Sequence, residues 1–440
     1  MKKNTFHLVS LGCAKNLVDS NVLAQLLEAE NLTYTESPED AEFVLINTCG
    51  FIHDARQESQ EAIREFAGLK ASNQKLIVTG CLAERWRDDL IKEHPGIDGL
   101  IGTRRLEDII PLLRELGVEG KVSRYHDYPV LQYAPGASYT AIQGGSSYLK
   151  VADGCHRSCA FCAIPGIKGS LVSRDVDDIL LDAHFLQDVG VSEINLIAQD
   201  VTAYGADRGE SDGLANLLAR MLPQIPAVPW VRLLYTYPGM ITENLIELMA
   251  NTEQLLPYLD IPLQHASPEV LKSMRRPSDI ESVRRTIQTM RDRIPNLVVR
   301  TTFIVGFPTE TENHFQQLYD FVGELGFDHI GVFTYSPEVG TFAESLGDPT
   351  SQEVKETRRE KVMELQSRLA FEKKQALIGT TLNVLIEGVD EEQEVLIGRS
   401  YRDAPEIDGL VVANGIAEVG EMVEVEIEGV GPYDLFGSQV

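Results

Sequence analysis

Short apolar runs alternate with amphipathic stretches along the first 118 residues of the chain. The runs are about five residues long and partly β-branched, as buried parallel strands are. Helical patterns lie between them, over residues 16–30, where leucines recur at helical spacing, and over residues 58–69. This alternation predicts a doubly wound α/β domain over residues 1–118. Its strands are predicted at 6–10, 43–47 and 76–80.

A second strand–helix series begins after residues 119–147, which are rich in Tyr, Pro, Gly and Ser and are predicted to be a linker. Six regular βα units favour a partial (βα)6 barrel over residues 148–374, with its active site at the carboxyl ends of the strands. A charged helix over about 352–376 leads out of the barrel. The predicted strands are 148–152, 193–198, 231–235, 259–261, 298–305 and 329–334. The predicted helices are 176–188, 214–221, 243–251, 280–291 and 312–325.

Residues 375–440 have a different pattern, with short β-rich runs at 381–386, 394–398 and 422–427 between Gly and Pro residues. This pattern predicts a small all-β barrel. The segment holds two basic residues, Arg399 and Arg402, against fourteen acidic ones, a net charge of −12.

Composition and charge narrow the class of protein. With 440 residues, 43% hydrophobic and 24% charged, the chain is expected to bury several cores. No apolar stretch approaches the roughly 20 residues of a membrane span, and the start has no signal-peptide pattern, so we expect a cytoplasmic protein with no membrane partner. The formal charge of −28 argues against a general nucleic-acid binder and favours basic partners.

Three of the six cysteines are bunched directly after the first strand predicted for the barrel. Cys155, Cys159 and Cys162 present three thiolates from one loop, which suits an iron–sulfur cluster. The lack of a fourth nearby cysteine leaves one iron open to a cofactor or substrate. The alternative is a zinc knuckle that uses His156 as a fourth ligand. Knuckles usually come as paired ligand turns, which makes that alternative the weaker one.

This spacing on a barrel strand resembles the signature of the radical S-adenosylmethionine (radical SAM) superfamily. The resemblance implies a [4Fe-4S] cluster whose open iron binds SAM and cleaves it to a 5′-deoxyadenosyl radical. Three further residues are candidates for binding SAM: Arg174 after the cluster loop, Gln199 at a strand end, and Gly306 where adenosine would approach. Each, like His265 past another strand, could equally have an ordinary loop or surface role.

The other three cysteines are far apart in sequence but occupy equivalent positions. Cys13, Cys49 and Cys81 each follow a predicted strand and stand next to Gly or Thr. Residues just past the carboxyl ends of neighbouring strands converge on one crevice of a doubly wound sheet. A single cysteine at such a position is usually a small buried hydrophobe. Three of them together predict a second iron–sulfur cluster, again with one open iron.

An N-terminal domain with these three cysteines, a radical SAM core and a C-terminal TRAM barrel resembles the plan of the methylthiotransferases over essentially the whole chain. The resemblance implies that the second cluster carries the sulfur to be inserted, while one SAM supplies the radical and another the methyl group. The alternative is a second cluster used only for electron transfer. Ala14, Lys168 and Thr309 stand where the family commonly has Pro, Arg and Gly, and none of them is a cluster ligand.

Within this family, residues 10–20, 233–238 and 404–409 look like the RimO-type branch, whose members modify the β-carbon of an aspartate in ribosomal protein uS12. The acidic segment 375–440 agrees, because it would repel tRNA phosphates and attract a basic protein. Implied partners are uS12, free or in the small ribosomal subunit, an electron donor and a sulfur donor. The runner-up is the MiaB-type branch, which acts on an adenosine in tRNA. A non-catalytic, zinc-bearing module associated with the ribosome is a third possibility.

Overall fold

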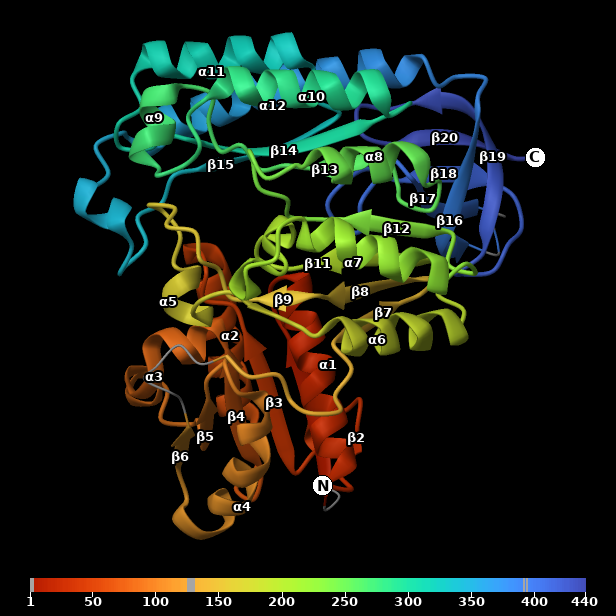
Figure 1. The fold of residues 1–440 in the computed structure, drawn as a ribbon. Helices are drawn as coiled ribbons and strands as arrows, with labels where there is room; N and C mark the ends of the chain where they lie inside the picture. The colour runs from red at the N-terminus through yellow and green to blue at the C-terminus, as the bar shows by residue number, and fades with distance from the viewer. Residues whose placement is uncertain (1–3, 125–130, 391, 393–394) are drawn as a thin grey trace. The chain divides into compact units, whose positions relative to one another are not determined.

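The computed structural model describes residues 4–124, 131–390, 392 and 395–440, and the chain divides into two compact units (Figure 1). The first unit consists of Met1–Ala141, Leu149–Arg174 and Glu338–Thr341. The second unit consists of Ile142–Tyr148, Asp175–Pro337 and Phe342–Val440. The stretch that carries Cys155, Cys159 and Cys162 therefore packs with the N-terminal residues.

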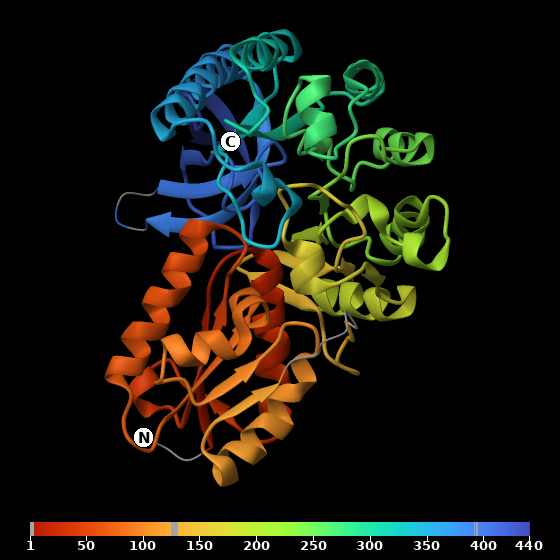
Figure 2. The same ribbon diagram turned by 90° about the vertical axis from the view of Figure 1, so that its left-hand side faces the viewer.

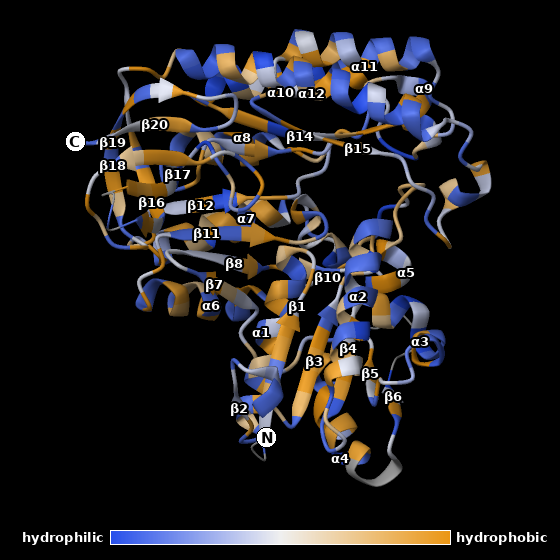
Figure 3. Cartoon of the chain, turned by 180° about the vertical axis from the view of Figure 1, so that it is seen from behind, coloured by the Kyte–Doolittle hydropathy of each residue, from blue (hydrophilic) through white to orange (hydrophobic). Residues whose placement is uncertain are grey.

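The first unit is built on a six-stranded sheet in the order β2-β1-β3-β4-β5-β6, in which all neighbours are parallel. Helices α1 and α4 cover one face and α2 and α3 cover the other (Figure 2). Strands β3 and β4 are almost wholly buried. Figure 3 shows the hydrophobic colouring of β3. The predicted doubly wound domain is confirmed. The strands are β1 (Thr5–Ser10), β2 (Thr33–Tyr34), β3 (Phe43–Thr48), β4 (Lys75–Gly80), β5 (Gly99–Ile101) and β6 (Val122–Arg124). The helices are α1 (Ala14–Ala29), α2 (His53–Leu69), α3 (Cys81–Glu93) and α4 (Ile109–Glu119).

Six strand–helix repeats follow, as the sequence predicts. Their strands lie in two sheets, β12-β11-β8-β7 and β13-β14-β15, and the long helix α12 (Gln352–Gln375) packs on β15. The strands are β7 (Thr140–Gln143), β8 (Ser146–Lys150), β11 (Glu193–Ile197), β12 (Trp230–Leu233), β13 (Tyr258–Asp260), β14 (Val298–Val305) and β15 (His329–Thr334). The helices are α6 (Val176–Asp188), α7 (Gly213–Met221), α8 (Glu243–Asn251), α9 (Pro268–Ser273), α10 (Ile280–Arg293) and α11 (Glu312–Leu325).

The C-terminal strands close into the predicted all-β barrel, in the order β16-β17-β18-β20-β19. Alternate residues of each strand, such as Leu396, Val425 and Ile427, fill its core. The strands are β16 (Thr381–Asp390), β17 (Val395–Ser400), β18 (Val411–Asn414), β19 (Met422–Val430) and β20 (Leu435–Gln439).

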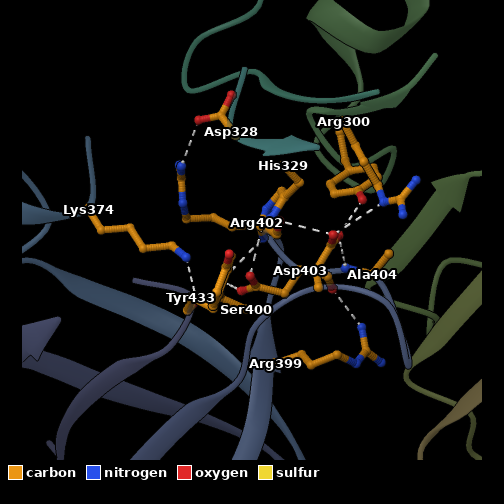
Figure 4. Close-up of polar contacts among 12 residues, drawn as sticks. Arg300, Asp328, His329, Lys374, Arg399, Ser400, Arg402, Asp403, Ala404 and Tyr433 are labelled. Atoms are coloured by element: carbon orange, nitrogen blue, oxygen red, sulfur yellow. Dashed lines mark hydrogen bonds and ion pairs between the residues drawn. The ribbon is translucent and has the colours of Figure 1, made fainter. Parts of the chain in front are cut away.

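Buried polar contacts attach this barrel to the preceding part of the second unit (Figure 4). Arg402 Nη2 lies 3.1 Å from Asp328 Oδ1, and Arg402 is the only basic residue besides Arg399 in 375–440. His329 Nδ1 lies 3.4 Å from an oxygen of Asp408, and Lys374 donates to the carbonyl of Tyr433. The charged side chains at this junction, Arg402 and Asp328 among them, are therefore paired with each other inside the second unit.

The stretch predicted to be a linker, 119–147, contains β6, β7 and the start of β8, while residues 125–130 lie outside the described residues. Strands of three or four residues are too short to show a clear alternation in sequence. In the part of the chain that the structure describes, no helix has the length and apolarity required to cross a bilayer.

Candidate functional site

The three scattered cysteines lie at the carboxyl ends of three adjacent parallel strands. Cys13 follows β1 and is the N-cap residue of α1, Cys49 follows β3, and Cys81 follows β4 as the first residue of α3. Strands β1, β3 and β4 are neighbours in that order, so the three thiols share one edge of the sheet. Each cysteine thus follows the strand that the sequence analysis assigned to it, and the role of the three as cluster ligands stays a prediction.

A glycine allows two of these strand ends to approach each other closely. Gly12 has φ +94°, and a Cβ at this position would lie 2.7 Å from Cys49 Cβ and 3.1 Å from its sulfur. Any larger residue would displace Cys49 or strain the backbone. Gly12 therefore keeps Cys13 and Cys49 close together.

Asn16, which the sequence analysis did not single out, ties the three strand ends together. Its Nδ2 donates to the carbonyls of Leu11 (2.9 Å) and Thr48 (3.0 Å), and its Oδ1 lies 3.9 Å from Cys81 Sγ. The side chain is 1% exposed although it belongs to α1. The available signal in the sequence was a polar residue three positions after Cys13, within the first turn of the predicted helix.

Burial and the neighbouring thiols shift the pKa values of Cys49 and Cys81 in this triad. Burial raises the pKa of the Cys81 thiol to about 12; Lys168 opposes this shift, and Cys13 and Cys49 add to it. Burial likewise raises the pKa of Cys49. Burial therefore favours the protonated form of the Cys49 and Cys81 thiols, and a metal that binds these two must displace their protons.

The other triad, Cys155, Cys159 and Cys162, lies in a loop between β9 (Ala152–Asp153) and α5 (Ile164–Lys168), and all three of its side chains are partly exposed. Gly154 has φ +71°, and a Cβ there would lie 2.1 Å from the carbonyl oxygen of Ser170. The turn at Gly154 lets Cys155 N–H donate to the Gly169 carbonyl at 3.0 Å. The Arg157 N–H lies 3.4 Å from Cys155 Sγ, where it stabilises a thiolate.

Throughout residues 4–124, 131–390, 392 and 395–440 the cysteines are free thiols, and no group of three or more His, Cys, Asp or Glu side chains is arranged to hold a metal ion. His156, the fourth ligand of the zinc alternative, is exposed. The fit to iron–sulfur clusters lies in the donor type and the backbone: each triad offers three thiols, and glycines with positive φ permit the close turns beside Cys49 and Cys155.

Helix α5 connects the two triads within the first unit. It begins two residues after Cys162 and packs against α3, which begins at Cys81. The buried guanidinium of Arg104 donates to the carbonyls of Ile167 (2.8 Å) and Gly166 (2.6 Å) and thereby ties α5 to the N-terminal domain. The two triads thus belong to one packed structure and not to separate lobes.

The predicted SAM-binding residues are placed as follows. Arg174 is 4% exposed; its Nη1 donates to the Lys150 carbonyl at 2.8 Å and its guanidinium lies 4.9 Å from the centre of the Tyr139 ring. These contacts support the strand that leads to Cys155. A direct role of Arg174 toward SAM stays a prediction.

Gln199 and Gly306 lie in the second unit, past the carboxyl ends of β11 and β14. Gly306 has φ +75°, and a Cβ there would lie 2.4 Å from Cγ of Lys355. In this structure the space that glycine leaves open is therefore filled by Lys355. His265 is fully buried, with Nε2 3.0 Å from Glu310 Oε2, which gives it an internal structural partner.

Three family models match the chain. Residues 5–102 match the family described as uncharacterized protein family UPF0004, residues 149–322 match the radical SAM superfamily, and residues 378–440 match the TRAM domain. Among curated proteins, the ribosomal protein uS12 methylthiotransferase RimO of Aquifex aeolicus (strain VF5) is 45% identical over 435 residues, which cover 98% of this chain and 96% of that protein. The protein of the same name from Acetivibrio thermocellus is 40% identical over 450 residues, covering 100% and 99%.

Solved structures share the fold at low identity. The radical SAM methyltransferase TsrM from Kitasatospora setae, with tryptophan and aza-SAM bound, matches with a TM-score of 0.55 and 16% identity, covering 75% of this chain and 73% of that one. The cobalamin-dependent radical SAM enzyme OxsB matches with a TM-score of 0.53 and 12% identity, covering 82% and 56%. These two likenesses concern the fold alone.

Proposed function

Because this chain belongs to the RimO family of radical SAM methylthiotransferases, we propose that it replaces a C–H bond at the β-carbon of an aspartate in ribosomal protein uS12 with a C–S–CH3 group. The observation that carries this proposal is the match over 98–100% of the chain, which includes both cysteine triads. The β-carbon of aspartate has no leaving group and no readily removed proton, so the reaction calls for a radical.

Cys155, Cys159 and Cys162 would hold a [4Fe-4S] cluster, which with SAM supplies the radical that removes the substrate hydrogen when both are bound. The chain's own contribution is the Gly154 turn, which orients Cys155, and the Arg157 N–H, which stabilises its thiolate. Arg174, Gln199 and Gly306 remain our candidates for contacts to SAM.

Cys13, Cys49 and Cys81 would hold a second [4Fe-4S] cluster, the carrier of the sulfur to be inserted, and a second SAM would methylate that sulfur. Asn16 keeps the three strand ends in register for this task, and Gly12 leaves room for Cys49. The packing of α5 on α3 supports the transfer of sulfur between neighbouring sites and not between distant domains.

The exposed acidic residues of the C-terminal barrel favour a basic protein as its partner. Glu424, Glu426 and Glu428 alternate along β19 with buried residues and are all exposed. The cross-strand neighbours of Glu426 are the uncharged Thr381 and Ser438. Since Arg399 and Arg402 turn inward to ion pairs, the positive charges of this barrel do little to offset the acidic ones outside. This surface favours uS12 over tRNA.

We further propose the division 1–118 (N-terminal domain), 119–147 (linker), 148–374 (radical SAM core) and 375–440 (TRAM barrel), a cytoplasmic location, and the need for an electron donor and a sulfur donor. Iron and acid-labile sulfide analysis tests the cofactors: about eight irons per chain are expected for two cubane clusters. Zinc alone would favour the non-catalytic module.

The test of the function is mass spectrometry of tryptic uS12 and of tRNA nucleosides from cells that lack this chain. We expect the aspartate-containing uS12 peptide to lose its methylthio mass while methylthiolated adenosines persist. Loss of the tRNA modification with uS12 unchanged would establish the MiaB-type alternative instead.

The partner surface is tested by replacing four exposed acidic residues of the barrel with Gln: Glu421, Glu424, Glu426 and Glu428. Binding to uS12 should weaken, and the loss should shrink as salt rises, because exposed charges act within a Debye length of about 8–10 Å. A matched control removes four exposed charges from α12, at Glu353, Glu360, Glu364 and Glu372. Equal effects of both quadruple variants would show that only net charge matters.

A further inference from the structure

Four buried charged side chains form a closed ring in the first unit. Lys168 Nζ lies 2.7 Å from Asp19 Oδ2 and 3.2 Å from Asp153 Oδ2, and Lys150 Nζ contacts Asp19 Oδ1 and lies 3.1 Å from Asp153 Oδ2. Each carboxylate is thus shared by both ammonium groups. The four side chains are between 0% and 4% exposed. We name this group the Lys–Asp ring.

The members of the ring lie within a few residues of a cluster cysteine in the sequence. Asp19 belongs to α1, the helix that Cys13 caps, and Asp153 ends β9, two residues before Cys155. Lys168 ends α5, six residues after Cys162. The ring therefore includes one residue just before and one just after the segment that carries Cys155, Cys159 and Cys162, and one residue of α1, the helix that Cys13 caps.

The ring is electrically balanced, with two ammonium groups and two carboxylates. Burial alone would lower the pKa of the Lys168 ammonium, but Asp153 and Asp19 outweigh it and hold that pKa well above its usual value. Buried ion pairs add little net stability over apolar residues, and their best-attested use is to specify register. Nothing in the chemistry proposed above needs four buried charges for acid–base work.

We propose that the Lys–Asp ring is a positioning device that sets the register between the two cysteine triads, with Lys168 as its central residue. The inference rests on the proposed function, because register between the triads matters only if both hold clusters that cooperate. Its consequence is that breaking the ring uncouples SAM cleavage from sulfur insertion without removing any cluster ligand.

The test is Lys168→Met, which leaves two buried carboxylates with one ammonium group. In the cluster-free protein, amide hydrogen–deuterium exchange over residues 153–169 should accelerate. In the reconstituted protein with both clusters reduced, the dipolar broadening between their electron paramagnetic resonance signals should change. The ratio of 5′-deoxyadenosine to methylthiolated product should rise about tenfold, the low end of effects seen when residues that orient ligands are removed.

Two control variants separate register from general damage. Lys168→Arg keeps the charge and the donors and should restore all three measurements. Lys70→Met breaks another ion pair of the same unit, 2.6 Å from Asp98 Oδ2, and should leave them unchanged. If Lys168→Met does not fold, the double variant Asp19→Asn/Lys168→Met retains a neutral Lys150–Asp153 pair and should fold while it still shows the faster exchange and altered broadening.

Wild-type exchange rates, broadening and product ratio in Lys168→Met, or in the double variant where the single one does not fold, would overturn the positioning role. Failure of the proposed function has a separate signature. In that case the wild-type protein forms no methylthiolated uS12 peptide, whatever the ring variants do to hydrogen exchange.

Discussion

The carboxylate of Glu193 joins β11 to the C-terminal barrel inside the second unit. Its contacts allow us to work out how much the free energy of unfolding should fall when this carboxylate is removed. Its Oε1 lies 2.8 Å from Arg232 Nε and its Oε2 lies 2.6 Å from Nη2 of Arg399 on β17. All three side chains are at most 1% exposed. Glu193→Gln would leave two buried guanidinium groups without this carboxylate, and removing one partner of a buried ion pair costs about 3–5 kcal/mol. Since Arg399 keeps Glu387 at 2.6 Å, we expect the low end, about 3 kcal/mol.

Urea unfolding of the cluster-free chain measures this loss. The sequence has two tryptophans, and Trp230 lies two residues before Arg232 on β12. In a Trp86→Phe background, Trp230 fluorescence then reports on the second unit. The matched control is Glu387→Gln: because the Glu387 side chain is 29% exposed, its loss should cost less than about 1 kcal/mol. Equal losses for the two variants would refute the argument that Glu193 is the buried anchor.

The same carboxylate predicts a dependence on pH. Burial alone would raise the pKa of Glu193, but Arg232 and Arg399 outweigh it and lower that pKa from its usual 4.5 to about 2. Because the folded-state pKa is the lower one, the stabilisation is fully present above about pH 4.5 and is lost as the pH falls toward 2. Trp230 unfolding midpoints should therefore decline across this range in the parent chain, and Glu193→Gln should remove that part of the decline.

Three further predictions concern the cysteine sites. Gly12→Ala should lower the iron content of the N-terminal site, because its Cβ would lie 2.7 Å from Cys49 Cβ; Gly68→Ala, which meets no atom within 4 Å, should not, and equal iron in both would contradict the crowding argument. Cys159→Ala should abolish 5′-deoxyadenosine formation from SAM under reducing conditions, measured by chromatography; a wild-type yield would remove this triad from the radical chemistry. Cys49→Ala should retain SAM cleavage but lose sulfur insertion, and normal amounts of methylthiolated uS12 would rule out a sulfur-carrying role.

The sequence by itself determined the alternation of the main strands and helices and the position of each cysteine relative to a predicted strand. Buried parallel strands and amphipathic helices are local patterns, so β3, β4 and the helices α6, α8 and α11 are visible in the residues themselves. Cysteines that directly follow such strands must share one edge of a parallel sheet, so Cys13, Cys49 and Cys81 form a group on the strength of the strand pattern alone. Their role as cluster ligands stays a prediction that iron analysis can test.

Only the tertiary structure decided which charges are internal. Asp19 and Lys168 are 149 residues apart and Glu193 and Arg399 are 206 apart, and in sequence each looks like one more solvated charge. The sequence likewise does not show the role of Asn16, which contacts residues at the ends of three strands. Local patterns carry no information about partners at such separations, because desolvation and pairing arise only when distant segments pack together. That packing places α5, which follows the loop of Cys155, Cys159 and Cys162, against α3, which begins at Cys81, and it leaves the C-terminal barrel with an acidic strand facing solvent.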